Sequence, residues 1–163
     1  MICCVTGHRP KGFSFPRTME NPLFVNYLEE IKQAVEDMVS KGYSHFISGM
    51  AEGADLDFAA SVLSAREIHP HIILEAALPY PYVPRQTPLV GLETGRDKIL
   101  PLCDRVVEVS THYFKGCMQK RNRYMVDSAD IVLAIWNGEH SGGTWNTIQY
   151  AVLTGKDVRF ISV

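Results

Sequence analysis

The sequence predicts an α/β fold built on a mostly parallel sheet of about six strands. Short apolar runs alternate with segments of helical period at intervals of roughly 25–30 residues, which is the pattern of strand–helix–strand units with right-handed crossovers. The clearest run, from Ile131 to Trp136, is apolar at every position, as expected of a strand buried on both faces of a parallel sheet. We therefore expect a three-layer, doubly wound arrangement with helices on both faces of the sheet.

The individual elements follow from the same alternation. Strands are expected at Ile2 to Thr6, His45 to Ser48, His71 to Leu78, Arg105 to Val109, Ile131 to Trp136 and Val158 to Val163. Helical spacing of apolar residues predicts helices from Leu23 to Val39, from about Leu56, from about Leu92 to Leu100, from Met118 to Asp127 and from Gly142. The expected apolar stripes include Leu23, Ala60 and Val152. The loops from Lys11 to Pro22 and from Pro79 to Pro84 have no period, and three prolines exclude regular structure from the second.

Length and composition indicate one ordinary globular domain spanning residues 1–163. The chain is 46% hydrophobic and 21% charged, and its net charge of −2 gives no global reason to expect nucleic acid or an anionic membrane as partner. No apolar run approaches the roughly 18 residues that a membrane span needs, and Met1 to Val5 is too short for a signal-peptide core. We therefore expect a cytoplasmic protein without a membrane partner.

The four cysteines agree with a reducing compartment. Cys3 and Cys4 are adjacent in the first predicted strand, whereas Cys103 and Cys117 stand alone, and no Cys-x-x-Cys pair occurs. We expect ordinary thiols and no metal site.

Candidate binding residues gather where the predicted strands end. In open α/β sheets, ligands bind beyond the carboxyl ends of the strands, where several loops meet. These ends supply Thr6, Gly7, His8 and Arg9 after the first strand, Ser48, Gly49, Glu52, Gly53 and Asp55 after the second, Pro79 and Tyr80 after the third, and Gly142, Gly143 and Thr144 after the fifth. Small residues and a cation at converging ends suit a phosphate-bearing ligand.

The last strand–helix unit carries the most suggestive motif. A strand, a glycine turn and a helix N-terminus expose backbone N–H groups where the helix dipole favours an anion. Plainer interpretations remain for the other ends, because Gly7 and Gly49 also fit tight strand-to-helix turns. Likewise, Glu52 and Asp55 fit either acids that match a helix dipole or ligands of ribose hydroxyls.

Several common α/β enzyme classes are excluded by missing motifs. The sequence has no G-x-x-x-x-G-K-[ST] phosphate loop, no G-x-G-x-x-G dinucleotide fingerprint and no G-x-S-x-G nucleophile elbow. A P-loop enzyme, a redox Rossmann domain and an α/β-hydrolase are therefore not expected.

With these residues in view, the chain resembles the SLOG superfamily, which includes the DNA-processing protein DprA and the LOG cytokinin-activating phosphoribohydrolases. The matching stretches are Thr6-Gly7-His8-Arg9-Pro10, Ser48 to Asp55, Leu78-Pro79-Tyr80, Arg121 to Asp127 and Ser141-Gly142-Gly143-Thr144. Their order along nearly the whole chain is most similar to the small bacterial branch typified by YpsA and YspA. The resemblance implies a single Rossmann-like domain that binds a nucleotide-derived ligand of the NAD or ADP-ribose kind.

The same resemblance argues against catalysis. LOG enzymes carry a G-G-x-G-T-x-x-E motif whose glutamate serves cleavage of the N-glycosidic bond. Alignment on Gly142-Gly143 places Gln149 at that glutamate, and alignment on Gly143-Thr144 places Thr147 there. Neither residue is a carboxylate acid or base, so Glu52, Asp55 and the LOG-type helix arginine Arg121 are left as weak catalytic candidates.

Three functions therefore compete at this stage. The leading expectation is binding or sensing of a nucleotide derivative at the strand ends, with Arg121 adding charge and no cofactor required. The second is an N-glycosidic hydrolase that uses Glu52 or Asp55. The third is a DprA-like single-stranded DNA binder with a basic cluster of Lys120, Arg121 and Arg123, but the acidic net charge and the lack of a basic stripe lead us not to expect nucleic acid as a partner. Whether Trp136 and the Tyr80–Tyr82 loop are buried or self-associate leaves a homo-oligomer open.

Overall fold

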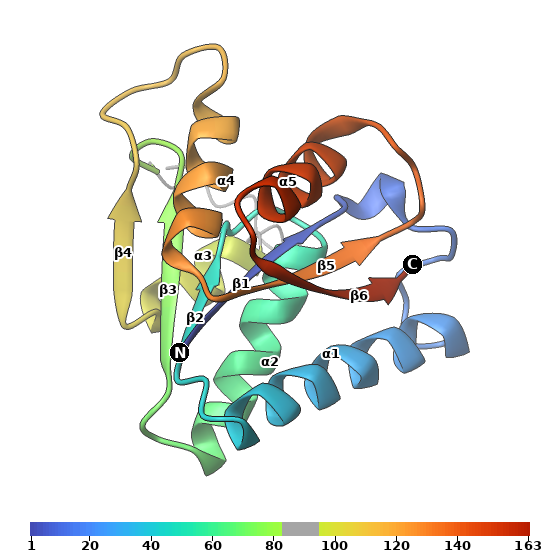
Figure 1. The fold of residues 1–163 in the computed structure, drawn as a ribbon. Coiled ribbons are helices and arrows are strands. Elements are labelled where there is room, and N and C mark those ends of the chain that lie inside the picture. Colours follow the sequence, from blue (N-terminus) through green and yellow to red (C-terminus); the bar gives the residue numbers. More distant parts are fainter. Residues whose placement is uncertain (83–94) are drawn as a thin grey trace.

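The strands form one parallel sheet in the order β4-β3-β2-β1-β5-β6 (Figure 1). The structure, a computed structural model, describes residues 1–82 and 95–163. The strands are β1 (Ile2–Gly7), β2 (His45–Ser48), β3 (Ile73–Leu78), β4 (Arg105–Glu108), β5 (Ile131–Trp136) and β6 (Asp157–Ser162), and each neighbouring pair is parallel. The helices are α1 (Pro22–Ser40), α2 (Ala54–Ile68), α3 (Gly95–Ile99), α4 (Cys117–Ser128) and α5 (Gly142–Leu153), with short 3₁₀ turns η1 (Pro10–Gly12) and η2 (Leu100–Leu102).

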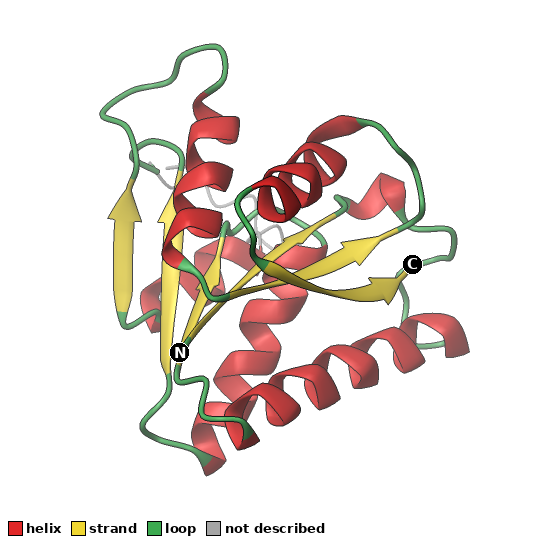
Figure 2. Cartoon of the chain, viewed as in Figure 1, coloured by secondary structure: helices red, strands yellow, loops and turns green. Residues whose placement is uncertain are grey.

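Helices cover both faces of this sheet, so the predicted doubly wound α/β fold is confirmed. In Figures 1 and 2, α1 and α2 lie on one face, and α4 and α5 lie on the other. From β1 the chain builds outward through β2, β3 and β4 on one side, and it then returns to add β5 and β6 on the other side. The point where the strand order reverses lies between β1 and β5, and open α/β sheets bind ligands at the carboxyl ends of such a pair.

Most predicted boundaries agree with the structure to within two residues. The strand expected from His71 begins at Ile73, because the N–H of Ile72 donates to the carbonyl of His69 (3.1 Å) and closes a turn around Pro70. Of the helix expected over 92–100, residues 95–99 form α3 and Leu100 begins η2, while residues 92–94 lie outside the described residues, as do the last two residues of the Pro79–Pro84 loop.

Three residues of the expected apolar stripes are exposed instead. Leu23 is 58% exposed, Val152 is 63% exposed, and Ala60 also faces solvent. Each of them neighbours a residue that the helix does bury. Because successive side chains on a helix point about 100° apart, the position beside a buried residue turns away from the sheet, and hydrophobicity alone does not reveal it.

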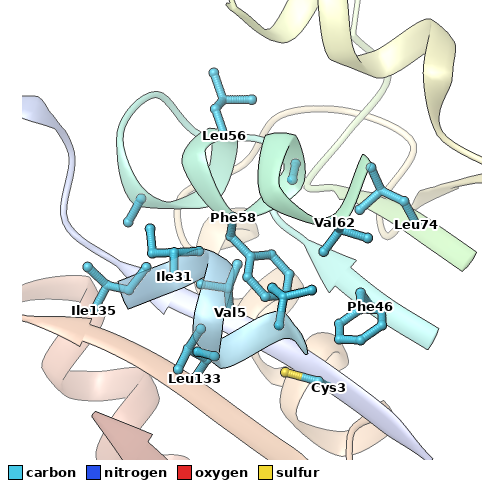
Figure 3. Close-up of a cluster of buried hydrophobic side chains, with 14 of the residues drawn as sticks. Cys3, Val5, Ile31, Phe46, Leu56, Phe58, Val62, Leu74, Leu133 and Ile135 are labelled. Carbon is cyan, nitrogen blue, oxygen red and sulfur yellow. The ribbon is translucent and has the colours of Figure 1, made fainter. Parts of the chain in front are cut away.

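The larger of two apolar clusters lies between the sheet and the α1–α2 layer (Figure 3). The rings of Phe46 on β2 and Phe58 on α2 meet there at 6.1 Å between centroids, and both side chains are fully buried. Burying a side chain of this size stabilises the fold by roughly 1.5–3 kcal/mol. Such contacts fix α2, and with it the loop that follows β2, against the end of β1.

A buried carboxylate ties α4 to the other face of the sheet. Glu75 on β3 is 1% exposed and accepts hydrogen bonds from His45 Nε2 (3.0 Å) and from the Tyr124 hydroxyl of α4 (2.8 Å), and Arg105 lies 3.7 Å away. Burial raises the pKa of Glu75, but the hydrogen bonds from His45 and Tyr124 outweigh it and leave the pKa below its ordinary value. The carboxylate therefore remains charged in the folded protein and holds the helix that carries Arg121.

Replacing Glu75 by glutamine (E75Q) is expected to lower the free energy of unfolding by about 1–3 kcal/mol near neutral pH, because hydrogen bonds to a charged acceptor are lost. A carboxyl whose pKa is depressed by folding stabilises above its ordinary pKa, here 4.5, and loses that contribution as the pH falls through the folded value. The difference between wild type and E75Q in urea unfolding should thus shrink below that pH. The exposed Glu67 of α2, changed to glutamine, is the matched control; a cost for E75Q that does not vary with pH would contradict the assignment.

Candidate functional site

A pocket of about 690 Å³ opens at the carboxyl ends of β1 and β5. We call it the crevice. The segment that follows β1, helix α4 and the N-terminus of α5 contribute its walls. It brings together eight of the residues singled out from the sequence, namely Thr6, Gly7, His8, Arg9, Asp55, Arg121, Gly143 and Thr144.

As far as the described residues show, the other predicted residues do not line the crevice. They are Ser48, Gly49, Glu52, Gly53, Pro79, Tyr80 and Gly142. Ser48 is buried, and its hydroxyl donates to the backbone carbonyl of Asp55 (2.7 Å). Glu52 is exposed. Tyr80 packs edge-on against Tyr113 at 5.7 Å between ring centroids, so it contacts the segment that follows β4.

The N-terminus of α5 presents an open backbone to the crevice. Gly142 begins the helix at φ +80°, where other residues are strained, and both Gly142 and Gly143 are exposed. A Cβ built on either glycine would meet no atom within 4 Å. Because the first N–H groups of a helix have no partner within the helix, this end of α5 offers donors and a favourable dipole to an anion.

A buried ion pair forms the floor of the crevice. Arg121 of α4 is 6% exposed, and its Nη1 lies 3.4 Å from Asp55 Oδ2 at the start of α2. The N–H of Ala51 also donates to that oxygen (3.3 Å). Burial raises the pKa of Asp55, and the charge of Arg121 and the Ala51 hydrogen bond only partly oppose the rise. Among the described residues the Arg121 Nε is buried and has no hydrogen-bond partner.

Two glycines are needed for packing around this floor. A Cβ on Gly49 would collide with the guanidinium of Arg121, and a Cβ on Gly7 would collide with the Cβ of Ala54. The N–H of Ala54 in turn donates to the carbonyl of His8 (3.1 Å), which joins α2 directly to the end of β1. Both glycines are therefore required for packing, and Gly7 lines the crevice as well.

His8 contributes a neutral imidazole. Burial lowers its pKa, while the charge of Glu139 and a hydrogen bond with Asn137 act in the opposite direction without restoring it. Its Nε2 is buried and has no hydrogen-bond partner among the described residues. At neutral pH the ring is therefore an uncharged hydrogen-bonding group beside the crevice.

The sequence reasoning missed several lining residues, including Lys11, Asn137 and Glu139. Asn137 and Glu139 lie within three residues of the end of β5, so the rule that ligands bind beyond the carboxyl ends of strands would have identified them. They were missed because the prediction for this strand end named only Gly142, Gly143 and Thr144. Asn137 Nδ2 donates to the carbonyl of Gly12 (3.1 Å) and holds η1 against β5. Lys11 lies in a stretch without any period, and no sequence signal marks it.

Contacts with α1 and α2 anchor the loop between η1 and α1. Both terminal nitrogens of Arg17 donate to the Asp57 carboxylate of α2 (2.8 and 2.9 Å), and the Tyr27 hydroxyl donates to the same group (2.8 Å). The Arg17 guanidinium also lies 4.5 Å from the Phe13 ring. Since Phe13 lines the crevice, this anchor fixes one wall of it.

A basic and aromatic segment adjoins the crevice. Between Glu108 and Asp127 the chain has four basic residues and no acidic one, at Lys115, Lys120, Arg121 and Arg123. All but Arg121 are exposed, as are the rings of Tyr113 and Phe114. The Lys120 amine lies 6.0 Å from the Phe114 ring. Exposed cations beside exposed rings are the components of single-stranded nucleic-acid grooves.

Comparison with known proteins relates the fold to a DNA-processing protein. No protein-family model matches the chain. The uncharacterized SPbeta prophage-derived protein YoqJ of Bacillus subtilis is 26% identical over 149 residues, which cover 83% of this chain and 86% of that protein. DNA processing protein A (DprA) of Helicobacter pylori, in a structure that describes its single-stranded DNA binding mode, superimposes on 98% of this chain with a TM-score of 0.66 and 15% identity. The chain has a DprA-like fold.

A second DprA supports this conclusion. The structure of DprA from Streptococcus pneumoniae matches 99% of the chain, with a TM-score of 0.64 and 15% identity. Both DprA chains are longer, since the match covers 64% of the first and 50% of the second. The likeness is thus to one portion of each DprA protein.

The DprA-like fold corrects two predictions made from the sequence. Nucleotide-ligand sensing as the leading function is wrong, and so is the expectation that nucleic acid is not a partner, because the structure of the H. pylori protein that shares this fold describes a single-stranded DNA binding mode. The physical reason is that a net charge of −2 averages over the whole surface, whereas the cations at the crevice and along α4 are local.

The described ranges hold neither a membrane-spanning helix nor a cluster of metal-binding side chains. Among residues 1–82 and 95–163, no helix is long and apolar enough to cross a lipid bilayer. The same ranges hold no group of three or more His, Cys, Asp or Glu side chains placed to bind a metal ion.

Proposed function

We propose that this chain binds single-stranded DNA, with a backbone phosphate in the crevice and the strand running along α4. The observation that carries the proposal is the match of 98% of the chain to the fold of H. pylori DprA, whose structure describes single-stranded DNA binding. At 15% identity that match concerns the fold, so the chemistry has to come from the residues of this chain.

Those residues supply what a phosphate requires. The crevice is lined by the cations Arg9, Lys11 and Arg121 against the two carboxylates Asp55 and Glu139, and Asp55 is already paired with Arg121. The N-terminus of α5 adds backbone donors and its dipole. A phosphodiester that enters the crevice therefore meets a net positive site with free N–H groups.

The strand outside the crevice meets further cations and rings. Lys120 and Arg123 are exposed on α4, and Phe114 lies beside Lys120. Cations that follow a backbone and aromatic faces that stack on bases bind single strands with little sequence preference. A duplex holds its bases inside and cannot stack them on these rings, so the single strand is expected to bind more tightly.

Fluorescence anisotropy with a labelled single-stranded oligonucleotide tests the proposal. With about four phosphates contacted, the logarithm of the affinity should fall with the logarithm of salt with a slope near −3, which is about a 50-fold loss between about 50 and 200 mM salt. A duplex of the same sequence should bind more weakly. No salt-dependent affinity for the single strand at low ionic strength would refute the proposal.

Replacing Gly143 by aspartate (G143D) is expected to weaken this DNA binding about tenfold or more, because it places a negative charge at the anion-binding end of α5. The fold should tolerate the change, since Gly143 has no positive φ and a Cβ there meets nothing within 4 Å. Gly143→Asn, of equal size and without charge, is the matched control and should bind within about threefold of wild type. Equal affinities for the two variants would show that no phosphate lies at this helix end.

We further propose that the chain belongs to the small bacterial SLOG branch typified by YpsA and YspA. Two sequence stretches support it, Thr6-Gly7-His8-Arg9-Pro10 and Ser48 to Asp55, and in the structure both stretches meet at the hydrogen bond between Ala54 and His8.

We also propose a cytoplasmic location. All four cysteines are free thiols, as in proteins of reducing compartments.

A further inference from the structure

A second hollow lies between α4 and α5 and meets the crevice. Its volume is about 400 Å³, and Asn122 and Gly143 line both it and the crevice. The two hollows therefore adjoin each other at the N-terminus of α5. If a phosphate lies at Gly143, the next nucleotide of the strand would be within reach of the second hollow, because Gly143 lines both.

The chemistry of this second hollow differs from that of the crevice. Four of its lining side chains are carboxamides, Gln119 and Asn122 from α4 and Asn146 and Gln149 from α5, so we call it the amide groove. Asn122 donates to the Thr147 hydroxyl (2.9 Å). The side chains of Gln119, Asn146 and Gln149 are exposed and have no hydrogen-bond partner among the described residues.

Charge is almost absent from the amide groove, and flat groups line its wall. Among its described lining residues Arg123 alone is charged. The Arg123 guanidinium lies 5.2 Å from the centre of the Tyr150 ring, and the Tyr150 hydroxyl donates to Asp127 (2.9 Å), which fixes the orientation of the ring. Guanidinium planes and aromatic rings are the surfaces on which unstacked bases lie.

We propose that the amide groove receives one unstacked base of the DNA strand whose phosphate lies in the crevice. A carboxamide presents a donor and an acceptor side by side, which matches the edge of a base and not a phosphate. The free amides of Gln119, Asn146 and Gln149 supply these groups, and Arg123 with Tyr150 supplies a planar wall. This inference rests on the proposed DNA binding and adds that the protein contacts a base as well as the backbone.

The test compares a single-stranded oligonucleotide of thymidines with one of equal length whose sugars carry no bases. Because the phosphates are the same, the ratio of the two dissociation constants isolates the bases. For the wild-type protein we expect the abasic strand to bind about tenfold more weakly, as for the loss of a stacked and hydrogen-bonded base. In the double variant Asn146→Ala/Gln149→Ala the ratio should fall well below tenfold, to the part that stacking on the exposed ring of Phe114 still supplies, with the salt dependence unchanged.

The control variant also removes one asparagine and one glutamine side chain, but from a helix on the opposite face of the sheet. Asn26 and Gln33 are exposed on α1 (Figure 1), and the variant Asn26→Ala/Gln33→Ala should keep the wild-type ratio. A wild-type protein that binds both strands equally well, or a groove variant that retains the tenfold ratio, would overturn the inference and leave the proposed DNA binding intact. A wild-type protein that binds neither strand would overturn both.

Discussion

Replacing Asp55 by alanine (D55A) is expected to lower the free energy of unfolding by about 3–5 kcal/mol, because it leaves the Arg121 guanidinium as an uncompensated charge in the interior. Arg121 is 6% exposed, and the side chain of Asp55 is the only carboxylate among the described residues that pairs with it. For a domain of this length the loss amounts to a fall in melting temperature on the order of 10 °C. Thermal and urea unfolding followed by circular dichroism measure it.

The control for D55A lies in the loop just before α2. Glu52 is an exposed carboxylate three positions earlier, and Glu52→Ala should change the stability by less than about 0.5 kcal/mol. If D55A and Glu52→Ala were equally stable, Arg121 would have to reach solvent or another partner when Asp55 is removed, and the floor of the crevice would be looser than the structure shows.

Removing both charges separates the structural role of the pair from its role in binding. The pKa of Asp55 is raised by burial despite the nearby Arg121, so the fold disfavours the carboxylate charge. Replacement of a buried ion pair by apolar residues of similar size is often neutral or stabilising, and the double variant Asp55→Leu/Arg121→Met should recover most of the stability lost in D55A. It should nevertheless bind DNA more weakly than wild type, because the crevice loses a cation.

The fold was predictable because each strand and helix is encoded by its own stretch of sequence. The run from Ile131 to Trp136 coincides with β5, and His45 to Ser48 coincides with β2. The contacts between elements were not predictable in this way. Glu75 meets His45 and Tyr124, which stand 30 and 49 positions away, and nothing in the local pattern of any of the three marks the partnership.

The candidate site was predictable in part for a geometric reason. Parallel strands end at one edge of the sheet, so residues after β1 and β5 must lie close together. The role of each glycine did not follow from that rule. A missing Cβ makes room either for a ligand or for the protein itself, and at Gly49 the room is filled by Arg121.

The expectation that nucleic acid is not a partner was wrong because it relied on the net charge of the whole chain and not on the positions of the charged residues. Helix α1 carries Glu29, Glu30, Glu36 and Asp37 on the face of the sheet opposite to α4 and α5 (Figure 1). Those acids cancel the cations in the total, yet in physiological salt they lie beyond the screening length of about 8 Å from a ligand on the other face. A protein with a slightly acidic total charge can thus present a basic site.

Replacing Gly7 by alanine (G7A) is expected to lower the free energy of unfolding by about 3 kcal/mol, at the upper end of the range for overpacking. The new Cβ would collide with the Cβ of Ala54 and lie 3.0 Å from the Cβ and 3.2 Å from the carbonyl oxygen of Ile135. All three atoms belong to or adjoin the backbone, so no flexible side chain can move aside.

The comparison of G7A with Gly143→Ala tests whether the two crevice glycines serve different purposes. Gly143→Ala adds a Cβ in open space within a helix and should be neutral or stabilising by up to about 1 kcal/mol. Urea unfolding of both variants, with the DNA affinity of the folded fraction measured at low denaturant, gives the answer. A G7A protein as stable as wild type would mean that α2 does not press on the end of β1. A destabilised G7A protein that still binds DNA would assign Gly7 to packing, in contrast to Gly143, which has open space around it at the N-terminus of α5.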